Sequence, residues 1–148
     1  MIHEIRTYDL QPRSVPEFLE RTGGKIAKRL EYSKLIGFFF TEIGRLNQVV
    51  HIWEYEDLNH RSEVREQVVK DGIWPPDNAS LVISMQSDIF LPAPFLPELA
   101  VNRTIGPLFE FRVYKYPAGA IPKVVDAWST NIEARLRLSP TVGIWSSE

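Results

Sequence analysis

Three polar residues that could bind a ligand or move a proton lie at alternate positions near the N-terminus. Glu4, Arg6 and Tyr8 fall in residues 2–10, whose alternating pattern predicts a β-strand. Alternate residues of a strand point to the same face. This face could form a polar pocket for a small anionic or aromatic ligand. The same residues could instead form an ion-pair network that fixes an interface, because buried charges need partners.

The other face of this predicted strand is more apolar, and it is formed by His3, Ile5 and Thr7. We expect that face to pack on helices. The three polar residues would then point away from the helices, toward a facing sheet in the interior of a barrel. The glutamate and the arginine should pair with each other or with Glu42 across the sheet.

A second candidate pair is His51 and Trp53, which share one face of the strand predicted over 48–55. An imidazole at this position could act as a general base or bind haem iron, with the indole as a wall of the pocket. A lone histidine can equally be a hydrogen-bonded core residue, so the catalytic residues stay unassigned. Neither His3 nor His60 has a metal-ligand spacing to His51, and we expect no metal site and no cofactor.

Composition and charge narrow the function classes. The 148 residues carry a net charge of −2 with a pI near 6.0, which does not favour a nucleic-acid partner. The chain has no cysteine, which excludes disulfides, thiolate metal sites and thiol nucleophiles. No apolar run approaches the roughly 20 residues of a membrane span. We expect a protein without a membrane partner that resides in the cytoplasm.

The order of predicted elements indicates an α+β fold of the ferredoxin-like kind. Strands are predicted over 1–10, 35–43, 48–55 and 81–91, with helices from Pro16 to Leu30 and from Asp57 to Lys70. This is a β-α-β-β-α-β unit. Basic and acidic residues alternate in the second helix, among them Arg61 and Arg65, which favours an exposed face with salt links.

The C-terminal part of the chain resembles its beginning. Residues 1–42 align with 107–148 without a gap, and ten positions are identical, among them Glu4/Glu110, Arg6/Arg112 and Tyr8/Tyr114. We interpret this as an internal repeat. The predicted organisation is a complete unit at 1–91, a proline-rich connector at 92–106 and a partial second β-α-β copy at 107–148. A partial copy leaves strand edges uncovered, which predicts a homo-oligomer, most simply a dimer.

Several short motifs in this order resemble the NIPSNAP family. They are His-Glu-Ile-Arg-Thr-Tyr at 3–8, Gly37 before an aromatic strand, Thr-Glu-Ile-Gly-Arg-Leu-Asn at 41–47, and His-Ile-Trp-Glu-Tyr at 51–55 followed by Asp57, Leu58 and Arg61. The resemblance implies a ferredoxin-like domain that pairs sheets into a dimeric α/β barrel, between chains or between tandem copies. It implies no particular reaction, because the family has no settled catalytic activity.

Two functions therefore remain open. The first is an oligomeric binding or assembly module of the NIPSNAP kind, whose polar strand face specifies assembly. The alternative is a small-molecule-binding or enzymatic barrel, similar to monooxygenases or isomerases, with a polar pocket in the barrel. The second reading rests on analogy between folds, which cannot assign chemistry.

Overall fold

A computed structural model describes residues 1–96 and 105–147 of the chain. Contacts divide the chain into two compact units, Met1–Leu91 and Pro92–Glu148. The first unit has the expected β-α-β-β-α-β order, and a single turn of 3₁₀ helix, η1, precedes its last strand. Its elements are β1 (Ile2–Leu10), α1 (Val15–Arg29), β2 (Leu35–Phe40), β3 (Gln48–Tyr55), α2 (Leu58–Lys70), η1 (Ala79–Leu81) and β4 (Val82–Pro92).

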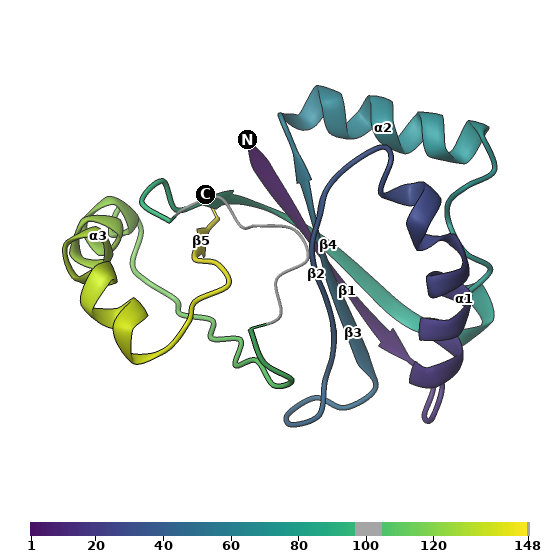
Figure 1. The fold of residues 1–148 in the computed structure, drawn as a ribbon, viewed down its shortest axis with the longest axis horizontal. Helices are drawn as coiled ribbons and strands as arrows, with labels where there is room; N and C mark the ends of the chain where they lie inside the picture. Colours follow the sequence, from purple (N-terminus) through teal and green to yellow (C-terminus); the bar gives the residue numbers. More distant parts are fainter. Residues whose placement is uncertain (97–104, 148) are drawn as a thin grey trace. The chain divides into compact units, whose positions relative to one another are not determined.

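The strands of the first unit form an antiparallel sheet in the order β2-β3-β1-β4. This is the mixed α/β architecture predicted from the order of elements, with two central strands and a split β-α-β connection. Both helices cover the same face of the sheet (Figure 1). On that face the register places Glu4 opposite Trp53 and Arg6 opposite His51.

Two clusters of buried side chains hold the helices on the sheet. Phe18 of α1 packs with Leu10 and Val49, and Tyr8 contacts the same cluster. Val64 and Val68 of α2 pack with Trp53 and Tyr55. The face of β1 that carries Glu4, Arg6 and Tyr8 is therefore the face under the helices.

The predicted orientation of β1 was wrong. It rested on the rule that the more apolar face of a strand packs on helices. The rule fails here because α2 itself supplies a charged partner for a buried carboxylate, so the polar face can be covered by a helix. The face of His3, Ile5 and Thr7 is the one on which neither α1 nor α2 lies (Figure 1).

Local signals set the ends of the elements that surround the site. The side chain of Asp57 accepts a hydrogen bond of 2.9 Å from the backbone N–H of His60, as expected of a helix N-cap. Strand β2 ends at Phe40 and not at residue 43, and Gly44 and Asn47 adopt left-handed backbone conformations in the loop that follows. Glu42 consequently lies in this loop.

The second unit contains α3 (Ile121–Leu138) and the two-residue strand β5 (Trp145–Ser146). Residues 107–117 form no regular strand, in contrast to the strand predicted at the start of the second copy. In the first unit, β1 bonds to β3 on one side and to β4 on the other. Within 105–147 no strands correspond to these two, so the backbone of 107–117 lacks such partners. The duplication stays a prediction.

None of the helices in residues 1–96 and 105–147 combines the length and the apolar character that a membrane crossing requires.

Candidate functional site

Glu4 is the centre of a buried charge network between the sheet and helix α2. Its side chain is completely buried. One carboxylate oxygen, Oε1, accepts hydrogen bonds from Arg6 at 2.8 Å, Arg61 at 2.7 Å and Ser87 at 2.6 Å. A guanidinium nitrogen of Arg65 lies 3.8 Å from the same oxygen. The network therefore joins β1, β4 and α2 through one carboxylate.

The charges around Glu4 keep it ionised. Burial opposes ionisation, but the hydrogen bonds from Arg61, Ser87 and Arg6 outweigh it and lower the pKa of Glu4 from 4.5 to about 2. The second oxygen, Oε2, is buried without a hydrogen-bond partner. Arg6 also donates from Nε to the hydroxyl of Tyr8 at 2.9 Å, so its guanidinium is held between two partners.

His51 lies in an aromatic sandwich on the neighbouring strand. Its ring stacks on Tyr8 at 5.2 Å and on Phe38 at 5.3 Å between centroids. The indole N–H of Trp53 donates to Nδ1 of His51 at 2.6 Å, so a neutral ring carries its hydrogen on Nε2. Burial, together with the positive charge of Arg6, lowers the pKa of His51 to about 3. The imidazole is neutral at physiological pH and only Nε2 remains for further chemistry.

Arg29 of α1 is a second buried guanidinium on this face. It lies over the ring of Trp53, with 4.2 Å from Cζ to the centroid. It donates to the hydroxyl of Ser33 at 2.7 Å and to that of Tyr55 at 2.9 Å. Within the described residues it forms no ion pair, and its Nε has no hydrogen-bond partner. Arg29 therefore holds the β2 and β3 ends of the sheet to α1 through neutral groups.

The structure brings most of the predicted site residues together. Glu4, Arg6 and Tyr8 meet His51 and Trp53 across the β1–β3 pairing. The pairing of Glu4 with Arg6 is as predicted, whereas their position in an open barrel interior is not.

The remaining predicted residues lie apart from this cluster. Glu42 is exposed in the loop after β2, and neither Glu4 nor Arg6 pairs with it. In the second unit Arg112 donates to Glu110 at 2.7 Å, and both side chains are exposed, as is Tyr114. The second set thus repeats the glutamate–arginine pair without a buried environment.

Sequence reasoning missed Arg29, Arg61, Arg65 and Ser87. The interpretation of the second helix as an exposed salt-linked face was wrong for Arg61, which reaches the buried Glu4. A signal was present, because residues 61, 64, 65 and 68 form one stripe at helical spacing. Since the two valines of that stripe are core residues, the arginines beside them also lie toward the sheet.

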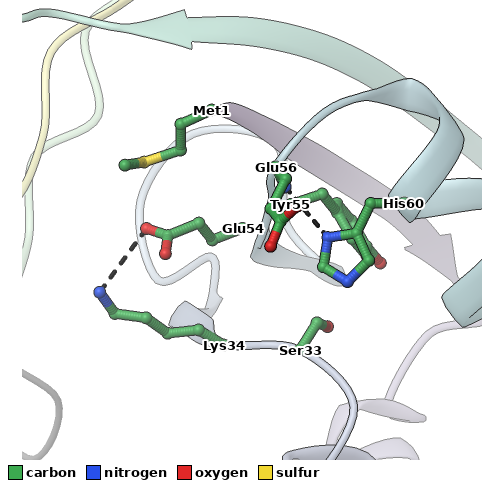
Figure 2. A pocket seen from close by; sticks show the side chains of 7 residues that line it. All are labelled: Met1, Ser33, Lys34, Glu54, Tyr55, Glu56 and His60. Carbon is green, nitrogen blue, oxygen red and sulfur yellow. Dashed lines mark hydrogen bonds and ion pairs between the residues drawn. The ribbon is translucent and has the colours of Figure 1, made fainter.

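A shallow hollow of about 350 Å³ opens at the other end of this layer, where the chain enters β2 and leaves β3 (Figure 2). The charged groups at its rim include Lys34, which lies 3.6 Å from Glu54. His60, in the first turn of α2, accepts the backbone N–H of Glu56 on its Nδ1 at 3.1 Å. The residues that line the hollow are Met1, Ser33, Lys34, Glu54, Tyr55, Glu56 and His60.

Neither site has the donor set of a metal centre. In residues 1–96 and 105–147 no three histidine, cysteine, aspartate or glutamate side chains gather closely enough to hold a metal ion. The arrangement around Glu4 is rich in hydrogen-bond donors instead, and arginine is the residue type that suits carboxylate and phosphate partners.

Comparison with known proteins places the fold and the motifs in one family. The NIPSNAP family model matches residues 3–97. NipSnap homolog 3A of Homo sapiens is 30% identical over 155 residues, and homolog 3B is 31% identical over 153 residues. These alignments cover 100% and 99% of this chain but 62% and 61% of those proteins. The chain thus spans about three fifths of the length of these curated relatives.

Solved structures agree with this result. Protein Atu4242 from Agrobacterium tumefaciens superposes with a TM-score of 0.62 at 34% identity, covering 66% of this chain and 98% of that chain. A NIPSNAP domain protein from Burkholderia xenovorans gives 0.61 at 32% identity, with 66% and 100% covered. The first is described as having unknown function and the second as uncharacterized, so neither names a reaction. The chain belongs to the NIPSNAP family.

Proposed function

We propose that this chain is a binding and assembly module that forms a homodimer through the face of the sheet opposite α1 and α2. One observation carries the proposal: both helices of the first unit cover the same face of its sheet (Figure 1). A sheet with an apolar face needs a second layer against it. A second copy of the same sheet supplies such a layer, because two sheets pack face to face at about 10 Å.

The composition of the helix-free face supports this role. The register places Ile5 opposite Ile52 and Thr7 opposite Val50 on that side, with Phe39 beside Val50 on the next strand. Ile5 and Ile52 are already buried in the single chain, whereas Thr7, Val50 and Phe39 are half-buried. Aliphatic and aromatic side chains at the centre of a sheet face are typical of a sheet-to-sheet interface.

The buried charge network favours an assembly role for the chain and not a catalytic pocket formed by the predicted site residues. Glu4 and Arg6 are held by each other and by residues of α2 and β4, and His51 is enclosed between two rings. These groups hold α2 on the sheet. They therefore keep the shape of the opposite face fixed for a partner. We propose no enzymatic function at this position.

Light scattering coupled to size exclusion tests the proposal. The wild-type chain should elute with twice the mass of 17.1 kDa. Val50→Arg places a charge on the helix-free face and should give the monomer with unchanged circular dichroism, since an unpaired charge in an apolar interface is unfavourable. Val69→Arg is the matched control, because Val69 is 60% exposed on α2. A wild-type monomer, or dimers of both variants, would contradict the proposal.

A cytoplasmic location is part of this proposal, and the absence of cysteine agrees with a compartment in which disulfides do not form. Fractionation of cells that express the tagged chain would test it.

A further inference from the structure

Arg29 is a buried cation that has no carboxylate partner in residues 1–96 and 105–147. Its residue is 2% exposed, its guanidinium lies on the ring of Trp53, and no acidic side chain of the described residues lies within ion-pair distance. Burying an ionised group without a counter-charge is unfavourable, and guanidinium groups stay protonated in proteins. Burial lowers the pKa of Arg29, although the hydroxyl of Tyr55 partly offsets this. A positive charge is thus held in the layer between α1 and the sheet.

The two hydroxyls that Arg29 holds are also part of the wall of the hollow. Ser33 and Tyr55 accept hydrogen bonds from Arg29 and line the hollow beside Lys34 and His60 (Figure 2). A hydroxyl carries one hydrogen, and a hydroxyl that accepts from a cation directs that hydrogen away from it. The hydroxyl hydrogens of Ser33 and Tyr55 can therefore point to an acceptor on the far side from Arg29.

His60 adds a second donor to the hollow. Its Nδ1 accepts the backbone N–H of Glu56, so the hydrogen of the neutral ring is on Nε2. His60 lies in the first turn of α2, where the helix dipole favours a negative charge. Its ring meets that of Tyr55 edge to face at 6.0 Å, and together with the side chain of Met1 the two rings offer apolar contact area.

Two acidic residues at the rim limit what can bind. Glu54 is already paired, with His3 at 3.3 Å and with Lys34 at 3.6 Å. Glu56 is exposed, and its charge opposes the approach of an anion from the solvent. The hollow therefore presents hydroxyl and imidazole donors backed by a buried guanidinium, with one carboxylate that weakens the attraction.

We propose that this hollow binds a small carboxylate with an apolar body, through hydrogen bonds from Ser33 or Tyr55 and His60, with Arg29 as the counter-charge behind the wall. A carboxylate accepts several hydrogen bonds at once, and bonds between a charged acceptor and neutral donors are stronger than those between neutral groups. The volume of about 350 Å³ is within the range of small-molecule sites. The hollow borders the helix-free face at Glu54, which lies opposite His3, but its proposed donors are Ser33, Tyr55 and His60.

Benzoate and benzamide test the proposal as a pair, because they share shape and differ in charge. Titrations of the full chain followed by NMR should shift the backbone amides of Ser33, Tyr55 and His60 with benzoate. Benzoate should bind about tenfold more tightly than benzamide, which corresponds to the difference between charged and neutral hydrogen bonds. Equal or tighter binding of benzamide, or no shift with benzoate up to about 20 mM, would overturn the proposal.

Variants that are expected to change the benzoate affinity in opposite directions extend the test. His60→Phe keeps the aromatic contact and removes the Nε2–H, so it should weaken benzoate binding several-fold without touching Arg29. Glu56→Gln removes the opposing charge and should tighten binding a few-fold. Glu63 is an exposed charged residue of α2 outside the hollow, so Glu63→Gln should leave the affinity for benzoate unchanged. Affinities that do not follow this order contradict the assignment of the site.

Discussion

Glu4→Gln removes the charge that Arg6, Arg61 and Ser87 hold and keeps the size of the side chain. The fall of the Glu4 pKa from 4.5 to about 2 measures how much the folded state favours the carboxylate. One pKa unit corresponds to about 1.4 kcal/mol, so the network contributes about 3 kcal/mol to the free energy of unfolding at pH 7. The variant also leaves guanidinium groups without their counter-charge, which gives an expected loss of about 3–5 kcal/mol.

The pH dependence of this loss has a definite sign. The pKa of Glu4 is lower in the folded state than in the unfolded chain, so the stabilisation is complete above pH 4.5 and is lost as the pH falls toward 2. At pH 3 the unfolded carboxyl is mostly protonated while the folded one is mostly ionised, and about 2 kcal/mol of the stabilisation is gone. The difference between wild type and variant should shrink by that amount between pH 7 and pH 3.

Urea denaturation followed by tryptophan fluorescence measures this difference. Replacing Trp128 and Trp145 by phenylalanine leaves two of the four tryptophans, both in the first unit, as reporters of the unfolding of that unit. Glu63→Gln in the same background is the control, because this exposed carboxylate has no partner in the network. A Glu4→Gln effect that stays constant from pH 7 to pH 3 would refute the reasoning.

Three further outcomes follow from the same structure. Asp57→Ala should lower the free energy of unfolding by about 1 kcal/mol in urea denaturation, because α2 loses its N-cap; an unchanged midpoint would contradict this. Phe18→Ala should lower it by about 3–5 kcal/mol through a cavity under α1, whereas the exposed Val69→Ala should stay within about 0.5 kcal/mol. The imidazole of His51 should stay neutral from pH 8 to pH 5 in nitrogen-detected NMR, since burial lowers its pKa to about 3. Because that pKa lies below the unfolded value of 6.5, the stability that His51 contributes is present above pH 6.5 and declines as the pH falls; protonation near pH 6.5 would contradict the structure.

The sequence allowed the elements of the first unit to be predicted because their signals are local. The strand predicted over 48–55 coincides with β3, and the helix predicted from Asp57 to Lys70 coincides with α2 and its cap. Periodicity, a capping side chain and a terminal glycine act within a few residues, so they can be recognised in the sequence without knowledge of the tertiary fold.

The orientation of β1 could not be predicted from such local signals. Which face of a strand meets the helices depends on what the helices contribute, and Arg61 is far from Glu4 in sequence. Alternation places Glu4, Arg6 and Tyr8 on one face but does not say which layer covers that face. The stripe of arginines and valines on α2 was the available clue, because an arginine beside core valines needs a buried acceptor or an apolar surface.

The second unit shows the limit of reasoning from similarity within the chain. Residues 107–117 match the sequence of β1 at several positions, among them Glu110 and Arg112, yet they form no strand. Strand formation depends on neighbours that donate and accept backbone hydrogen bonds, and the similarity of one strand does not supply them. Glu110 and Arg112 form an exposed ion pair there.

In the proposed homodimer, a second copy packs on the face of the sheet opposite α1 and α2. The chain has no cysteine, so one introduced thiol reports on one position. The rate at which a thiol reagent labels Val50→Cys, on the helix-free face, is measured over a range of protein concentrations beside Val69→Cys on α2. Self-association predicts that labelling of V50C slows as the concentration rises while labelling of V69C does not. A V50C rate that is independent of concentration and as fast as that of V69C would contradict the claim.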